Sequence, residues 1–167
     1  MRNSKASHRR RVEVSQMIEA RMSHRFTASP ERVFDAWLDP ARIRKWMGLL
    51  ASDWGEFDMR RVETDARVGG RFTFSDMRPA GEAVHWGTYL EIDRPRKLVF
   101  TWFTSEEAEK ENSSVVTLTI APDGAGCTAT MVHQMDAKWA DYVQRTEKGW
   151  STMLAKIDAM LSAEAGQ

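Results

Sequence analysis

Residues 27–48 are TASPERVFDAWLDPARIRKWMG, and they predict two short helices in succession. Ser29 can cap the first helix, and Pro30 fits its first turn, where a missing N–H costs nothing. Asp39 can begin the second helix in the same way, and Gly48 can end it in a left-handed conformation. The apolar residues of each segment are spaced to lie on one helix face: Val33, Phe34, Trp37 and Leu38 in the first, and Ile43, Trp46 and Met47 in the second.

Short segments with alternating apolar residues predict an antiparallel sheet around this helix pair. A strand over at least Ala20–Thr27 precedes the helices. Turn signals such as Pro122-Asp123-Gly124 then separate strands by only a few residues, a spacing that favours hairpins over crossovers. The charged run Glu106–Asn112 is expected to be a solvated hairpin tip. The strands predicted after the helices are Phe57–Asp65, Gly70–Asp76, Val84–Asp93, Leu98–Phe103, Ser114–Ala121 and Cys127–Met135.

A long helix is predicted from about Lys138 to Ala163. Gly149 lies inside it, where glycine costs about 1 kcal/mol relative to alanine, so either a tight helix-to-sheet contact or space for another molecule is expected there. The whole pattern predicts a single α+β domain, in which a curved antiparallel sheet wraps around this last helix. The residues on its apolar face are Val143, Trp150, Met153, Leu154, Ile157 and Leu161.

Composition limits the classes of partner. The chain has 167 residues, 42% of them hydrophobic, with seven Trp and seven Phe, which is enough for one domain with a core and a pocket. The 24 basic and 24 acidic residues balance, so overall charge favours neither nucleic acid nor an anionic membrane. Cys127 is the single cysteine, and no apolar run of about 18 residues is present to span a bilayer. We expect a soluble protein of the reducing cytoplasm, and a homodimer is left open.

The amino-terminal segment has a different character. Residues 1–13 are expected to form a disordered basic tail, and residues 14–164 the single domain. The first eleven residues resemble the start of a signal peptide but lack the apolar segment that must follow. A solvated leader ahead of a start at Met17 or Met22 is the favoured interpretation, and contact of His8–Arg11 with nucleic acid is the minor one.

Five motifs follow one another along the chain: FTASPERVFDAWLDPARIRKWMG (26–48), VGGRFTF (68–74), HWGTYLEIDRPRKLVFTW (85–102), GCTATMVHQ (126–134) and EKGWSTMLAKIDAML (147–161). Together they cover nearly everything from residue 20 to residue 162. In this order they resemble the helix-grip fold of the START-like (SRPBCC) superfamily, and in particular its bacterial branch related to the activator of the Hsp90 ATPase. The resemblance implies a cavity between the sheet and the long helix, in which many relatives hold a small apolar or aromatic molecule.

Motifs for metal, nucleotide or nucleophilic chemistry are not found. The four histidines, at 8, 24, 85 and 133, show no metal-ligand spacing, so neither a metal nor a cofactor is expected. Strand alternation places His133 on the same side as Ala129 and Met131. Three roles stay open for it: a neutral core histidine with a hydrogen bond, a polar group that orients a ligand, or a general base. His85 is expected at a pocket mouth or at an exposed strand end.

Aromatic and methionine side chains predict an apolar ligand cavity on the inner face of the sheet. Phe72 and Phe74 share one strand face, as do Phe100 and Trp102. By family analogy Trp46 is expected near the cavity entrance, and Tyr89 and His133 are expected to orient the ligand. The candidate cavity residues are Trp46, Phe72, Phe74, Tyr89, Phe100, Trp102, Met131, His133, Trp150 and Met153.

Three functions are compatible with these residues. The favoured one is a binding module that sequesters or senses a small hydrophobic or aromatic molecule. The second is an enzyme of the cyclase or dehydratase type that uses the same cavity, with His133 moving a proton. The third is a partner of an Hsp90-type chaperone that acts through its surface; the chain, with one domain, lacks the additional amino-terminal domain that the resemblance associates with such activators.

Overall fold

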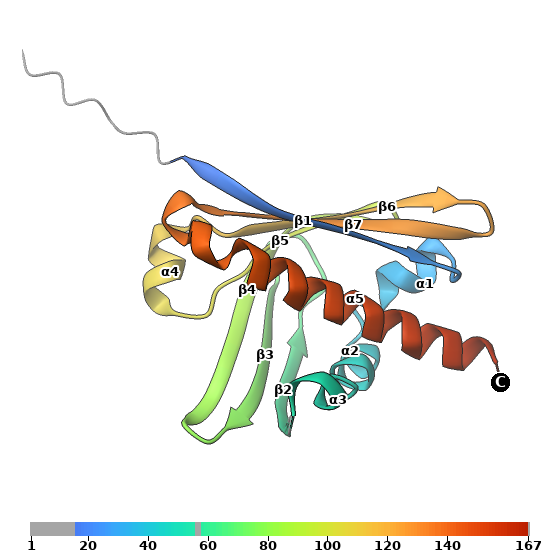
Figure 1. Cartoon of the computed structure of the whole chain (residues 1–167), viewed down its shortest axis with the longest axis horizontal. Helices are drawn as coiled ribbons and strands as arrows, with labels where there is room; N and C mark the ends of the chain where they lie inside the picture. The colour runs from blue at the N-terminus through green and yellow to red at the C-terminus, as the bar shows by residue number, and fades with distance from the viewer. Residues whose placement is uncertain (1–15, 56–57, 167) are drawn as a thin grey trace, which may run out of the picture.

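A computed structural model describes residues 16–55 and 58–166 of the chain (Figure 1). The predicted disordered tail, residues 1–13, lies outside the described residues, as does Phe57, where a strand was expected to begin. The expected domain bounds of 14–164 therefore stay a prediction.

One seven-stranded sheet forms the body of the molecule. Its strand order is β1-β7-β6-β5-β4-β3-β2, and every neighbouring pair is antiparallel. This confirms the expected hairpin topology, with strand boundaries that differ from the predicted ones by a few residues. The strands are β1 (Met17–Phe26), β2 (Asp58–Thr64), β3 (Arg71–Arg78), β4 (Gly81–Asp93), β5 (Lys97–Thr101), β6 (Val115–Asp123) and β7 (Gly126–Asp136).

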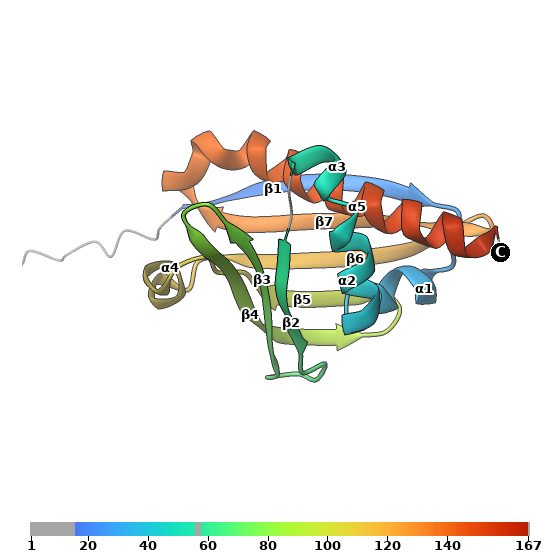
Figure 2. The ribbon, with the colours of Figure 1, turned by 90° about the horizontal axis from the view of Figure 1, so that it is seen from below.

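The sheet bends sharply along β4, its longest strand. The first part of β4 pairs with β3, and the pairing passes to β5 from Tyr89 onward, with a register shift between Tyr89 and Glu91. A Cβ at Gly87 would lie 1.9 Å from the carbonyl oxygen of Thr101, so only glycine permits this close strand approach. Figures 1 and 2 show the result: β2, β3 and β4 turn away from β1, β7 and β6 and form a second wall.

Two short helices follow β1 as predicted: α1 (Pro30–Asp35) and α2 (Pro40–Gly48). The Ser29 side chain accepts a hydrogen bond from the amide of Arg32, and the Asp39 side chain accepts one from the amide of Ala41, at 3.4 and 3.0 Å. Both expected caps are confirmed.

The expected left-handed ending at Gly48 is wrong. The next residue, Leu49, keeps a right-handed helical conformation with φ −73°, and a further short helix, α3 (Ala51–Trp54), follows. Leu50 is completely buried between the two helices, so a reversal at Gly48 would remove that side chain from the core. The left-handed glycine lies instead after α3, at Gly55, with φ 81°.

The charged run Glu106–Asn112 connects the paired strands β5 and β6 and is largely exposed, so the expected solvated hairpin tip is confirmed. It is not an irregular loop, however, because its charged residues form a helix, α4 (Glu106–Glu111). The Ser105 side chain accepts a hydrogen bond from the amide of Ala108 at 3.2 Å, and acidic side chains occupy the first turn, where they complement the helix dipole. Asn112 ends the helix in a left-handed conformation. None of the residues of α4 is buried, so the sequence signal for this helix is its cap and its charges, and not an apolar face.

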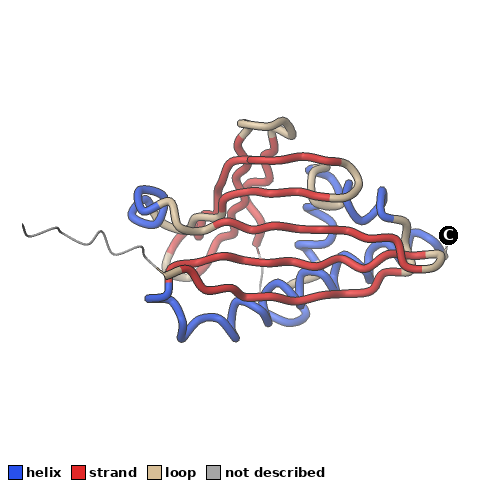
Figure 3. Tube along the Cα trace, turned by 90° about the horizontal axis from the view of Figure 1, so that it is seen from above, coloured by secondary structure: helices blue, strands red, loops and turns tan. Residues whose placement is uncertain are grey.

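The last helix lies across the inner face of the sheet (Figures 1 and 3). The segment predicted as one helix from Lys138 is divided into a 3-10 helix, η1 (Ala137–Tyr142), and the long helix α5 (Val143–Ala165). Trp139 departs from helical geometry inside η1, and Tyr142 precedes α5 with φ −98° and ψ −2°. The expected apolar face is confirmed: the buried side chains of α5 are Trp150, Leu154, Ile157, Met160 and Leu161. They pack into one core with the sheet residues Phe72, Phe74 and Met131.

This packing predicts the energetic cost of truncating α5. Ile157 is completely buried, so Ile157→Ala should lower the free energy of unfolding by roughly 2–5 kcal/mol, as expected for a core cavity. Leu49→Ala, at an exposed aliphatic position, is the control and should change it by less than about 0.5 kcal/mol. Urea unfolding of both variants measures the difference. Equal stabilities for the two would contradict the assignment of α5 as the central core element.

Candidate functional site

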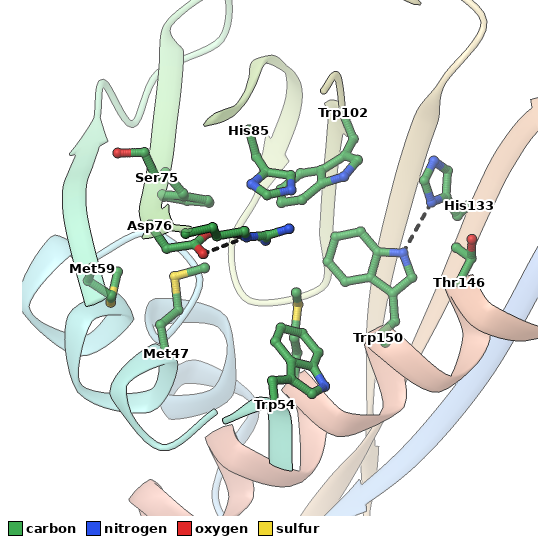
Figure 4. A pocket seen from close by; sticks show the side chains of 14 residues that line it. Met47, Trp54, Met59, Ser75, Asp76, His85, Trp102, His133, Thr146 and Trp150 are labelled. Atoms are coloured by element: carbon green, nitrogen blue, oxygen red, sulfur yellow. Dashed lines mark hydrogen bonds and ion pairs between the residues drawn. The ribbon is translucent and has the colours of Figure 1, made fainter. Parts of the chain in front are cut away.

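A cavity of about 250 Å³ lies between the bent sheet, α5 and the short helices α2 and α3 (Figure 4). It exceeds the roughly 150 Å³ that suffices to hold a benzene ring in a protein core. Aromatic and methionine side chains dominate its lining. The lining residues are Met47, Trp54, Met59, Phe74, Ser75, Asp76, Arg78, His85, Trp102, His133, Thr146, Gly149, Trp150 and Met153.

Trp150 of α5 connects the helix to the sheet at one side of this cavity. Its indole Nε1 donates a hydrogen bond to Nδ1 of His133 on β7 at 3.1 Å, and Nε2 of His133 lies 2.7 Å from the hydroxyl of Ser114. Because an indole N–H can only donate, Nδ1 must be the unprotonated nitrogen, and Nε2 carries the proton toward Ser114. Both ring nitrogens of His133 are therefore engaged.

The environment of His133 favours the neutral ring. Burial lowers its pKa from 6.5 to about 4, because the charged form would lose hydration without gaining a carboxylate partner. A base with this pKa and with its one lone pair engaged by Trp150 is poorly suited to remove a proton from a ligand. Of the three roles expected for His133, the geometry favours a neutral histidine held by hydrogen bonds.

Stacked aromatic rings form the apolar wall of the cavity. The ring of Trp102 lies 5.0 Å from that of Trp150 in an edge-on arrangement, and 5.2 Å from that of His85 in a stacked one. Behind them, Phe72 contacts Phe74 at 5.1 Å between ring centroids. Such pairs add to the energy of area burial and hold flat surfaces in fixed orientations, so this wall presents preformed aromatic faces.

A charged pair on β3 forms the polar wall. Asp76 is only 4% exposed, and its carboxylate accepts hydrogen bonds from Nε and Nη2 of Arg78 at 2.7 and 3.2 Å. This two-point pairing compensates the buried charge. His85 lies beside the pair; burial, followed by the positive charge of Arg78, lowers the pKa of His85. The polar wall thus combines a neutral imidazole with a guanidinium that keeps further N–H donors.

The structure separates the predicted site residues into three groups. Five of them line the cavity: Phe74, Trp102, His133, Trp150 and Met153. Three others line a small adjoining compartment: Phe72, Tyr89 and Phe100. The remaining two, Trp46 and Met131, lie in the hydrophobic core and line neither space. Trp46 is 1% exposed and donates its indole N–H to the carbonyl of Ala36 at 2.8 Å, so it holds α1 against α2 and is not at the cavity entrance, where it was expected.

Several lining residues were not among the sequence candidates. Asp76 alternates with Phe72 and Phe74 on β3, so strand periodicity alone could have placed it on the inner face. Trp54 was missed because α3 was not predicted. At Gly149 the sequence allows either a tight helix-to-sheet contact or space for another molecule, and the structure has space: a Cβ added there would meet nothing within 4 Å.

A wider hollow of about 520 Å³ adjoins the cavity on the side of α4 and η1. Exposed side chains at its outer part include Trp139 and Tyr142. Lys138 connects η1 to α4 there, with both carboxylate oxygens of Glu111 at 2.6 Å from its Nζ. The hollow shares with the cavity the residues His85, Trp102, His133 and Thr146.

Comparison with known families agrees with this architecture. The family model described as Activator of Hsp90 ATPase homolog 1-like protein matches residues 27–162. The chain belongs to this family. The match spans α1, α2 and α3, the strands β2 to β7 and most of α5, and it begins directly after β1.

Solved structures of similar fold come from several bacteria. Protein CV1439 of Chromobacterium violaceum is 25% identical with a TM-score of 0.68, and the match covers 85% of this chain and 95% of that one. Protein Ms6760 of Mycobacterium smegmatis is 24% identical with a TM-score of 0.69, over 87% and 92% of the two chains. SA2116 of Staphylococcus aureus, described as a protein of unknown function, is 17% identical with a TM-score of 0.75, over 91% and 98%. No curated protein matches the chain.

Two further observations bear on the classes of partner. Among residues 16–55 and 58–166, no group of three or more His, Cys, Asp or Glu side chains is arranged to bind a metal ion. None of the helices within these ranges is both long and apolar enough to cross a membrane.

The lowered pKa of His133 predicts a pH-dependent loss of stability. Unfolded chains bind the proton near pH 6.5, whereas the folded protein binds it only near pH 4. The stabilisation by the neutral ring is therefore complete above pH 6.5 and is lost as the pH falls toward 4, by ~3 kcal/mol over this window. Urea unfolding of wild type and His133→Gln at both ends of the window measures this contribution, because glutamine does not titrate. Parallel pH dependences for the two proteins would contradict it.

Proposed function

We propose that this protein binds a small, largely apolar or aromatic molecule in the cavity between the sheet and α5. The observation that carries the proposal is the cavity itself. It is a space of about 250 Å³ between the bent sheet and α5, and its lining includes three tryptophans and three methionines. Pockets that bind small molecules are concave, mainly apolar and equipped with a few polar groups. The fold family supports the same function, because START-like relatives commonly hold hydrophobic ligands.

The chemistry of the lining narrows the ligand. Trp102 and Trp150 present flat faces at a fixed edge-on angle, which suits an aromatic ring, and flexible methionines adapt to the rest of its outline. Transfer of the apolar surface of the ligand from water into the cavity supplies the binding energy. Arg78 and His85 of the polar wall provide hydrogen-bonding groups for a polar substituent on the part of the ligand in the main cavity, and Asp76 keeps Arg78 in place.

Two features separate this proposal from the alternatives. A cyclase or dehydratase that uses His133 as its base would require a lone pair directed at the substrate, whereas Nδ1 accepts from Trp150 and Nε2 faces Ser114. A role with a chaperone would rest on the family description alone. Binding is therefore the function that the geometry supports best. We place it in the cytoplasm, where a reducing environment suits the buried free thiol of Cys127.

Gly149 provides the sharpest test, because it faces the cavity from inside a helix. Gly149→Leu should raise the free energy of unfolding by about 0.5–1 kcal/mol through helix propensity. The same side chain should fill the cavity and weaken binding of the neutral fluorophore N-phenyl-1-naphthylamine by about tenfold or more, or about 1.4 kcal/mol. Fluorescence titration and urea unfolding measure the two effects, which have opposite signs.

Gly48→Leu is the matched control for this experiment. Gly48 also lies within a helix and has nothing within 4 Å of an added Cβ, but it is not a cavity residue. This variant should bind the fluorophore as the wild type does. The proposal fails if the wild type does not bind the fluorophore, or if both glycine variants bind it equally well.

A further inference from the structure

Two buried polar atoms lack a hydrogen-bond partner among the described residues: the indole Nε1 of Trp37 and the hydroxyl of Tyr89. The two side chains are 6% and 2% exposed. Buried Trp and Tyr normally find a partner for these groups, because an unsatisfied donor costs on the order of 1–3 kcal/mol. The other buried side-chain polar atoms described here are paired, so two exceptions in one part of the core call for an explanation.

Both residues line the same small compartment, which adjoins the main cavity. Its volume is only about 10 Å³, close to that of a single water-sized probe. Apart from these two side chains and the indole N–H of Trp102, its lining is apolar: Phe72, Phe74, Leu98, Phe100 and the ring of Trp102. Phe74 and Trp102 also line the main cavity, and they therefore form the partition between the two spaces.

We propose that this compartment is the subsite for one neutral acceptor oxygen of the ligand, a carbonyl or hydroxyl oxygen that Trp37 and Tyr89 bind by hydrogen bonds. This inference rests on the proposed function and specifies its ligand class. The aromatic or aliphatic frame occupies the main cavity, and its oxygen passes between Phe74 and Trp102 into the compartment.

Donor chemistry and charge decide which group fits. An indole N–H can only donate, and burial raises the pKa of Tyr89, so its hydroxyl stays protonated and available as a second donor. Two donors require an acceptor. A carboxylate or phosphate would be buried without a cation, because the compartment has no Lys, Arg or His in its lining, and this would cost far more than a neutral oxygen.

Size gives a second, independent restriction. A space for one water-sized probe admits a single oxygen but neither a ring nor a branched polar group. The ligand class is thus a ketone, aldehyde, phenol or alcohol on an apolar frame small enough for about 250 Å³. The charged wall of Asp76 and Arg78 belongs to the main cavity and does not contribute to this subsite.

A matched pair of probes tests the subsite: acetophenone and ethylbenzene, which share a ring and a two-carbon substituent and differ in the carbonyl oxygen. Displacement of N-phenyl-1-naphthylamine gives the affinity of each. Wild type should bind acetophenone about tenfold more tightly than ethylbenzene. In Tyr89→Phe this ratio should fall several-fold, while the affinity for ethylbenzene stays within about twofold, because the hydrocarbon does not use the hydroxyl.

The only other tyrosine provides the control. Tyr142 is exposed and lies outside the compartment, so Tyr142→Phe should keep the wild-type ratio. Thermal unfolding of Tyr89→Phe should show no loss of stability, because the substitution removes an unsatisfied hydroxyl from the core.

The outcomes separate the two proposals. Equal affinities of wild type for the ketone and the hydrocarbon, or a ratio unchanged by Tyr89→Phe, would overturn the subsite and leave hydrophobic binding intact. Failure of both probes and of the fluorophore to bind would overturn the proposed function and the subsite with it.

Discussion

The position of Trp150 is the constraint on which the rest of the site depends. Its indole N–H bonds to His133 on β7 at 3.1 Å, and its ring contacts Trp102 at 5.0 Å. One side chain therefore fixes α5 against β7 and against the residue that follows β5. The hydrogen bond also sets the tautomer of His133 and directs its N–H to Ser114. A buried polar network of this kind specifies a single arrangement, because breaking one bond leaves a second group unsatisfied.

The cavity exists because the two parts of the bent sheet diverge and α5 does not fill the space between them. The bend at β4 depends on the close approach of Gly87 to Thr101, and it carries Phe74, Asp76 and His85 away from the strands that hold His133. On the helix side, Gly149 leaves the space beside Trp150 open at a cost to helix stability. A larger side chain at Gly149 would stabilise the helix, and a protein selected only for stability would carry one. The open space therefore fits a site that holds a ligand in place of core side chains.

Much of this fold follows from the sequence because its signals are local. The caps at Ser29 and Asp39, the alternation in the strands and the apolar face of α5 each depend on residues within a few positions of one another. The residues of the site were only partly predictable, because a cavity forms where side chains from distant parts of the chain leave space between them. Trp46 has the same apolar character as Trp102, yet its hydrogen bond to Ala36 places it in the core. Only the tertiary arrangement separates cavity-lining aromatic residues from core ones, and the same holds for the missing partners of Trp37 and Tyr89.

The most direct test of the central claim is a crystal structure of the protein soaked with bromobenzene, whose bromine is located by its anomalous scattering. We predict one dominant bromine site enclosed by Trp102, Trp150 and Met153, with the bond between Trp150 and His133 preserved. A cavity that stays empty while bromine appears elsewhere, or collapse of the aromatic side chains into the space, would contradict the account.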